Sequence, residues 1–261
     1  MENDIWKMFL PFFFDPAALV ESLRYPLTHE NTWSDWRHRS ESTIEYYRLI
    51  IAAYREQVPG RAYPSIIVNS INLQQYLDWI NANDLESFAT ALVSEIERLT
   101  RAGADFGALC SNTPHIVFDE LQRRSSLRLI SIVEATCERV KQFGLKKVGL
   151  FGTRFTMQGK FYPDVFSRAG VELVTPDEAE QDYIHEKYMG ELLNDKFLPA
   201  TREEMLMIAG KLQSRAGIEG IILGGTECRC CCARTRSAMV STMESVSSIR
   251  RESMLIGSLR S

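Results

Sequence analysis

The chain has 261 residues, of which 45% are hydrophobic and 25% are charged, and its formal net charge is −4. This composition is typical of a globular protein with one large domain or two lobes of roughly 100–150 residues each. The net charge is mildly negative, whereas proteins that bind nucleic acid or an anionic membrane through their overall charge are positively charged. No apolar run approaches the roughly 20 residues that span a bilayer, and acidic Glu2 and Asp4 differ from the basic start of a signal peptide. We therefore expect a cytoplasmic protein whose cysteines remain thiols.

The two ends of the chain differ in composition from its centre. Residues 1–39 form an atypical N-terminal segment with eight aromatic residues, and a short helix is predicted over residues 15–23 because Asp15 can cap it and Pro16 suits its first position. Residues 228–261 form an atypical tail, rich in Cys, Arg and Ser, without any aromatic residue. The composition of this tail predicts at most a weak helix, over residues 239–254.

The central zone alternates strand-like apolar runs with amphipathic helical runs. This alternation predicts an α/β fold built from βα units around mainly parallel sheets. We assign residues 40–123 to a first α/β lobe and residues 124–227 to a second. In the first lobe we predict a helix over 42–54, a buried strand over 65–69, a helix over 84–102, a strand over 106–110 and a helix from Pro114.

The second lobe repeats the order of strand, small polar turn and helix, without a close sequence repeat. A short strand is predicted from Leu127 or Leu129 to Ile132, and further strands over 147–151, 171–174 and 220–223. Helices are predicted over 133–143, 156–168, 178–193 and 202–216.

Small polar turns follow three of these strands. Residues 111–113 are Ser-Asn-Thr, residues 152–157 are Gly-Thr-Arg-Phe-Thr-Met, and residues 224–227 are Gly-Gly-Thr-Glu. Open α/β sheets bind ligands outside the carboxyl ends of their strands, where helix N-termini favour carboxylate or phosphate. Each turn taken alone could have a purely structural role instead of binding a ligand. Hydroxyl and amide groups also cap helices, and glycines also occur where the backbone has positive φ. Three such turns together favour a site for an anionic ligand.

Other kinds of site have weaker support. Residues 228–232, Cys-Arg-Cys-Cys-Cys, offer four thiols for Zn²⁺ or Cu(I), but the second, separated ligand pair that zinc sites normally use is missing because Cys110 and Cys137 are isolated. We therefore predict no metal. No histidine has an obvious nucleophile partner, although a Ser/His/Asp triad needs no proximity in sequence. The chain also has no Walker A loop and no GxGxxG after a strand.

Four ordered motifs in the central zone carry a family resemblance. Residues 40–50 (SESTIEYYRLI) are similar to W-E-S-T…Y-Y…I, and residues 110–115 (CSNTPH), preceded by LTRAGAD, are similar to C-N-T-x-H. Residues 150–157 (LFGTRFTM) follow, and residues 222–227 (ILGGTE) are similar to G-C-T-E. On these motifs residues 40–227 resemble the aspartate/glutamate racemase family, the cofactor-independent amino-acid racemases.

The resemblance implies two pseudo-symmetric lobes with a ligand cleft between them. In the family, a cysteine thiolate of the first lobe removes the α-proton of a small amino or dicarboxylic acid, and a thiol of the second lobe returns a proton to the opposite face. It implies no PLP, no metal and no other cofactor, and neither nucleic acid nor membrane as partner. Because the family is often dimeric, it also implies a homodimer.

Both acid/base positions depart from the family pattern. Ser111 stands at the first cysteine position, where some members carry a hydroxyl residue, and Gly225 stands at the second, where glycine has no proton to give. The resemblance assigns substrate carboxylate binding to the donors Asn112, Thr113, Thr153, Thr156 and Thr226. Cys110 is expected to face away from the cleft, because neighbours on a strand point to opposite faces.

We therefore expect weak or absent two-base racemisation. The alternatives are a non-catalytic protein that binds a small acid on a decayed racemase scaffold, and a one-base isomerase or decarboxylase. Residues 1–39 and 228–261 lack the family's terminal segments, which predicts that alternative exons, a frameshift or a wrong gene model altered both ends.

Overall fold

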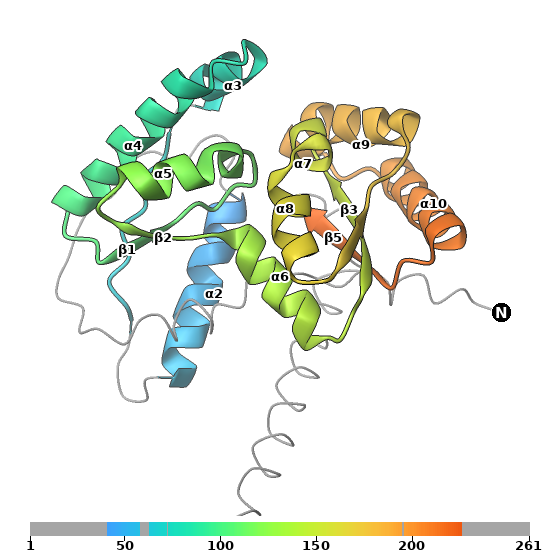
Figure 1. Ribbon diagram of the computed structural model, residues 1–261, viewed down its shortest axis with the longest axis horizontal. Coiled ribbons are helices and arrows are strands. Elements are labelled where there is room, and N and C mark those ends of the chain that lie inside the picture. The colour runs from blue at the N-terminus through green and yellow to red at the C-terminus, as the bar shows by residue number, and fades with distance from the viewer. Residues whose placement is uncertain (1–40, 58–62, 72, 195, 226–261) are drawn as a thin grey trace, which may run out of the picture.

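The computed structural model describes residues 41–57, 63–71, 73–194 and 196–225 (Figure 1). The helices predicted over 15–23 and 239–254, the cysteine run at 228–232 and Thr226 lie outside the described residues. Within the described part of the chain, no helix is long and apolar enough to cross a bilayer.

Two parallel sheets organise the described residues. In the first sheet, β1 (Phe106–Ala108) pairs with β2 (Arg128–Ile130). The second sheet has the order β4-β3-β5, with β3 (Lys147–Gly152) between β4 (Glu172–Val174) and β5 (Gly220–Gly224). Figure 1 shows the two sheets in the two halves of the molecule. The predicted α/β fold with parallel sheets in two halves is confirmed.

The helices of the first half surround the short first sheet. They are α2 (Glu41–Gln57), α3 (Leu73–Asn81), α4 (Leu85–Arg101), the 3₁₀ helix η2 (Thr113–Val117) and α5 (Phe118–Arg124). The predicted helices over 42–54 and 84–102 are confirmed, and the helix from Pro114 consists of η2 followed by α5. No predicted element corresponds to α3, although its inward-facing Tyr76 and Ile80 recur at helical spacing.

The helices of the second half cover the three-stranded sheet. They are α6 (Ile132–Gln142), α7 (Arg154–Gln158), α8 (Phe161–Arg168), α9 (Glu178–Gly190), the 3₁₀ helix η3 (Leu192–Asn194) and α10 (Pro199–Ala216). The prediction of one helix over 156–168 is wrong, because α7 and α8 are separate helices. Gly159 adopts extended backbone between them, where a Cβ would approach Phe155 O at 2.6 Å.

The buried strand predicted over residues 65–69 is also wrong. These residues form no strand, and the side chains of Ile67 and Val68 are 42% and 50% exposed. A strand needs a partner for its backbone N–H and C=O groups. Within the described residues, β1 pairs only with β2, so residues 65–69 have no such partner. The short apolar run over residues 65–69 was therefore not sufficient to form a strand.

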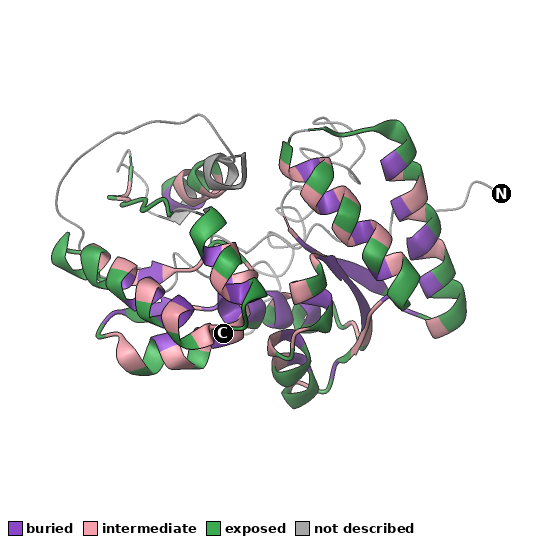
Figure 2. Cartoon of the chain, turned by 90° about the horizontal axis from the view of Figure 1, so that it is seen from above, coloured by how far each residue is buried: buried purple, intermediate pink, exposed green. Residues whose placement is uncertain are grey.

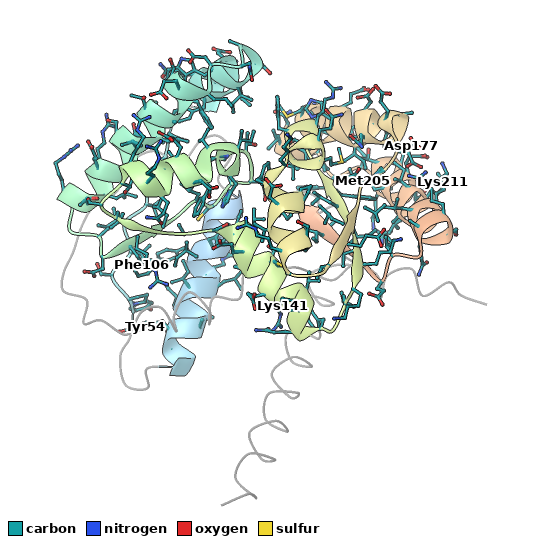
Figure 3. All side chains as sticks on the ribbon, in the orientation of Figure 1. Tyr54, Phe106, Lys141, Asp177, Met205 and Lys211 are labelled. Carbon is teal, nitrogen blue, oxygen red and sulfur yellow. The ribbon has the colours of Figure 1, made fainter. Side chains whose placement is uncertain are left out.

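The second sheet has a core on each face, which follows from the two-residue period of its strands. On one face Leu150 and Ile222 pack against α6 and α8. On the other face Phe151 and Ile221 pack against α9 and α10, where Met205 is fully buried (Figure 3). All residues of β3 except the first are buried, as are all residues of β5 except Leu223, and Figure 2 shows this sheet largely in the colour of buried residues. The second sheet is thus a central layer, whose strand ends hold the turns discussed below.

Local sequence sets several helix ends. Asp84 accepts from Ser87 N at 3.0 Å at the start of α4, and Asp177 forms a capping box with Glu180 at the start of α9. Gly217 ends α10 with φ 67°, a left-handed conformation that suits glycine.

Candidate active site

The turn after β1 is fixed by a buried neutral histidine. His115 Nε2 lies 3.2 Å from Ile132 N and must accept from that N–H, so Nδ1 carries the proton and donates to Ser111 O at 3.0 Å. The ring stacks on Phe118 with centroids 5.1 Å apart. Burial lowers the pKa of His115 to about 4, so the imidazole is neutral at pH 7. Both ring nitrogens bind backbone groups, and His115 therefore orients this turn and is not the base of Ser111.

Asn112 is oriented from the other half of the molecule. Its Oδ1 accepts a 2.8 Å hydrogen bond from the Tyr162 hydroxyl of α8. Tyr162 is only 2% exposed, and burial raises the pKa of its phenol, which therefore stays protonated and donates. Because Oδ1 is the acceptor, the Nδ2 amide group of Asn112 is the donor that remains for a ligand. Asn112 itself makes no side-chain cap at the start of η2.

The other two predicted residues of this turn are more accessible. Ser111 is exposed and Thr113, the first residue of η2, is half-buried. Cys110 is exposed as a whole residue, but neighbouring atoms crowd its sulfur, which lies 3.9 Å from Ala108 O, and this desolvation raises its pKa to about 11. The thiol beside Ser111 is therefore protonated at pH 7. It lies two residues beyond β1, where strand alternation no longer decides its direction.

The turn after β3 holds the two predicted threonines side by side. Thr153 caps α7 by accepting from Thr156 N at 3.4 Å, and the two Oγ1 atoms are 3.2 Å apart. Thr156 is 1% exposed and Thr153 is half-buried. Thr153 is thus the more accessible donor of the pair, and Thr156 holds it in place.

The turn after β5 needs glycine because neighbouring atoms leave no room for a side chain, and not because the backbone has a positive φ. Neither Gly224 nor Gly225 is among the residues with positive φ. A Cβ on Gly224 would approach Phe151 O at 2.8 Å and Thr156 Cγ2 at 2.9 Å. A Cβ on Gly225 would overlap the hydroxyl and ring of Tyr188, with Cζ only 2.8 Å away. The positive-φ interpretation of these glycines is therefore wrong, and neighbouring side chains fill their Cβ positions.

Helix α9 places further polar groups at the same edge of the second sheet. His185 Nδ1 accepts from Arg154 N at 3.2 Å, and Arg154 pairs with Asp182 at 2.7 Å. Burial, and then the charge of Arg154, lower the pKa of His185, which favours the neutral ring. Tyr188 follows His185 by three residues and so lies on the same face of the helix.

The structure brings the predicted residues after β3 and β5 together, and it links them to the turn after β1. The side chain of Thr156 lies against the Cβ positions of both Gly152 and Gly224, so the turns after β3 and β5 adjoin. Asn112 joins the second half through Tyr162. Sequence reasoning missed Tyr162 and Tyr188, because no local motif links residues 50 positions apart or connects a helix face with a distant glycine.

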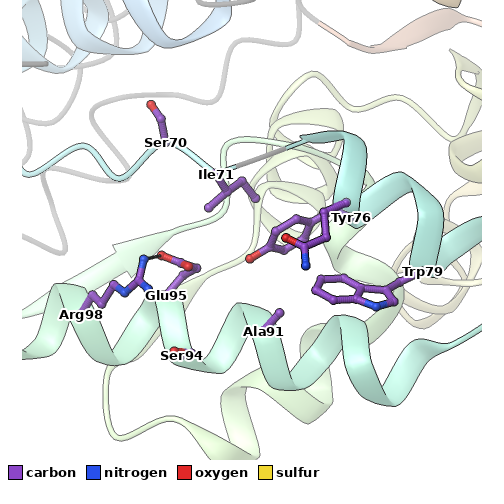
Figure 4. A pocket seen from close by; sticks show the side chains of 9 residues that line it. Ser70, Ile71, Tyr76, Trp79, Ala91, Ser94, Glu95 and Arg98 are labelled. Atoms are coloured by element: carbon purple, nitrogen blue, oxygen red, sulfur yellow. Dashed lines mark hydrogen bonds and ion pairs between the residues drawn. The ribbon is translucent and has the colours of Figure 1, made fainter. Parts of the chain in front are cut away.

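One pocket of about 380 Å³ lies in the first half, away from these turns (Figure 4). It lies between α3, α4 and residues 70–71, with Tyr76 and Trp79 on one side. Glu95 on its wall is already paired with Arg98 at 2.9 Å and accepts from Asn69 Nδ2 at 2.8 Å. The pocket contains none of the predicted site residues, so we place the site at the strand ends. Among the described residues, no group of three or more His, Cys, Asp or Glu is arranged to hold a metal.

The chain belongs to the Asp/Glu/hydantoin racemase family, whose pattern matches residues 39–249. This match extends past Glu227, where we expected the resemblance to end. The broad-specificity amino-acid racemase RacX of Bacillus subtilis is 29% identical over 119 residues, which are 46% of this chain and 51% of RacX. The chain therefore aligns with only about half the length of that relative.

Solved structures of similar proteins share the fold. An aspartate racemase homologue from Pyrococcus horikoshii is 32% identical with a TM-score of 0.63, and a provisionally assigned Asp/Glu racemase from Yersinia pestis is 31% identical with a TM-score of 0.67. Each match covers 76% of this chain and 85% of the solved chain. The Picrophilus torridus aspartate racemase, at 20% identity and a TM-score of 0.58, adds support for the fold alone.

Proposed function

We propose that this member of the racemase family binds a small amino or dicarboxylic acid at the strand ends and transfers a proton at its Cα without PLP or a metal. Asn112 supports the proposal most directly, because Tyr162 fixes its Oδ1 and so directs its amide donor. Thr153, at the start of α7, adds a hydroxyl beside helix N–H groups that favour a carboxylate. Thr113 and Thr226 are the remaining proposed donors.

Two-base racemisation of aspartate or glutamate should be weak or absent. Ser111 has a weakly acidic aliphatic hydroxyl that needs an activating base, and both nitrogens of its neighbour His115 are already bound to backbone groups. Gly225 has no acid/base group of its own. The reaction we propose is therefore slow proton exchange at Cα, with inversion slower still.

Deuterium wash-in tests this reaction. The protein is incubated in D₂O with each enantiomer of aspartate, glutamate and a set of other small amino acids, and Cα deuteration is followed by NMR. We expect measurable exchange that exceeds inversion measured by chiral chromatography. Inversion as fast as exchange, abolished by Ser111→Ala, would contradict the proposal of impaired racemisation.

A non-catalytic acid-binding protein is the second candidate, and the arrangement around Ser111 favours it. The same ligands would then raise the melting temperature by mass action without any deuterium exchange. Asn112→Ala should remove that thermal shift, whereas Asn81→Ala, a change at an exposed asparagine at the end of α3, should keep it. Size-exclusion chromatography at several concentrations tests the proposed homodimer.

A further inference from the structure

Tyr188 occupies the space that a side chain on Gly225 would fill. An ideal Cβ at Gly225 would overlap the Tyr188 hydroxyl more closely than any other atom, and then ring atoms Cε2 and Cζ. Tyr188 is 8% exposed and belongs to the core between the second sheet, α9 and α10. Its ring is therefore held by packing, with its polar end directed toward the end of β5.

The hydroxyl thus lies where the proposed site needs a proton-transfer group. Gly225 follows β5 directly, and the Thr156 side chain lies against the Cβ positions of Gly152 at the end of β3 and Gly224 at the end of β5. Ligands of open α/β sheets bind at such strand ends. A phenol is also a considerably stronger acid than an aliphatic hydroxyl such as that of Ser111.

We propose that the Tyr188 hydroxyl is the proton-transfer group on the β5 side of the site, in the place of a side chain on Gly225. This inference rests on the proposed function. In one direction the Tyr188 phenolate takes the Cα proton: the C–H bond breaks, an O–H bond forms, and the electron pair stays on Cα, delocalised into the substrate carboxylate. In the other direction the phenol returns a proton to Cα and becomes phenolate. Neither step changes any oxidation state.

The two faces of the substrate are then served unequally. Tyr188 exchanges the Cα hydrogen with solvent on its own face, and the weaker acid Ser111 serves the opposite face. Exchange with retention therefore outpaces inversion, which distinguishes this arrangement from a pair of equivalent acids.

Tyr188→Phe tests the role of the hydroxyl, because it keeps the ring and its packing. We expect Cα deuteration to fall about 100-fold or more, while the thermal shift produced by the same amino acid is kept. Tyr183→Phe, a change five residues earlier on α9 at a half-buried tyrosine, is the matched control and should exchange like the unaltered protein. If Tyr188→Phe exchanges at the unaltered rate, Tyr188 is not the proton-transfer group, although the proposed function stands. If the unaltered protein shows no exchange with any amino acid, the proposed reaction and the role of Tyr188 both fail.

A second pair of variants tests the placement without any activity. Gly225→Cys should lower the melting temperature because the new side chain overlaps Tyr188. In a Tyr188→Ala background, the same change should cost much less, since the overlapping ring is gone. Additive losses would show that Tyr188 does not fill this position and would overturn the inference.

Discussion

The turns after β1 and β5 end parallel strands in the two halves of the molecule, but different forces shape them. The first turn keeps its polar side chains. Tyr162 donates a hydrogen bond to the side chain of Asn112, and His115 holds the turn through the backbone oxygen of Ser111. The second turn has no side chains of its own on Gly224 and Gly225, and Thr156 and Tyr188 fill the vacated space. Pseudo-symmetric placement in a fold therefore does not give two sites equivalent chemistry. What stands at each position depends on the helix that packs over it.

The sheets behind these turns differ as well, and core truncation should show the largest effect. Leu150 on β3 is fully buried in a three-stranded sheet covered on both faces, and Leu150→Ala should cost about 4 kcal/mol of unfolding free energy. The matched change Leu129→Ala, on β2 of the two-stranded sheet, should cost about 2 kcal/mol. Urea denaturation of both variants measures the difference. An equal or larger cost at Leu129 would contradict this ranking of the two sheets.

Acid should loosen the first turn through His115. Its pKa is lowered in the folded state to about 4, from 6.5, so below pH 6.5 the unfolded chain binds a proton that the folded chain does not. Stability contributed by the neutral ring is fully present above pH 6.5 and is lost as the pH falls toward 4, by up to about 3 kcal/mol. Denaturation curves across this range should show the loss. His115→Gln should remove this part of the pH dependence, and an unchanged slope would refute the assignment.

Tyr162→Phe should weaken the link between the two halves. The hydroxyl is lost, Asn112 Oδ1 keeps no buried donor, and stability should fall by about 1 kcal/mol. Ligand affinity should fall as well, because the amide of Asn112 is no longer fixed. A double-mutant cycle with Asn112→Ala measures the coupling, which should be about 1 kcal/mol in unfolding free energy. Strict additivity would mean that the two side chains do not interact.

An effect of about the same size as that of Tyr162→Phe is expected at the cap after β3. Thr153→Ala removes the acceptor for Thr156 N and should cost about 1 kcal/mol, whereas Thr153→Ser should keep most of the stability. Thermal unfolding of the two variants measures this difference. If Thr153 also binds a carboxylate, only the alanine variant should lose the thermal shift with ligand. Equal loss in both variants would contradict a role for the hydroxyl.

Local pattern predicted most helices and strands because their ends are encoded locally. The helix predicted over 84–102 is α4, which Asp84 caps and which Gly103 follows with φ 88°. The strand expected over 65–69 failed because pairing depends on a distant partner. The single helix expected over 156–168 failed because the extended backbone of Gly159 ends α7 before α8 begins at Phe161.

The amino-acid sequence by itself determined the family, the alternation of strands and helices, and the turns at which polar residues collect. From the resemblance we also propose that Ser111 and Gly225 stand at the family's two acid/base positions. Only the tertiary structure decided that Tyr162 orients Asn112, that His115 has no nitrogen left for Ser111, and that Tyr188 fills the side-chain space of Gly225. These contacts join residues far apart in the chain, and side-chain packing, which sequence spacing does not encode, brings their atoms together.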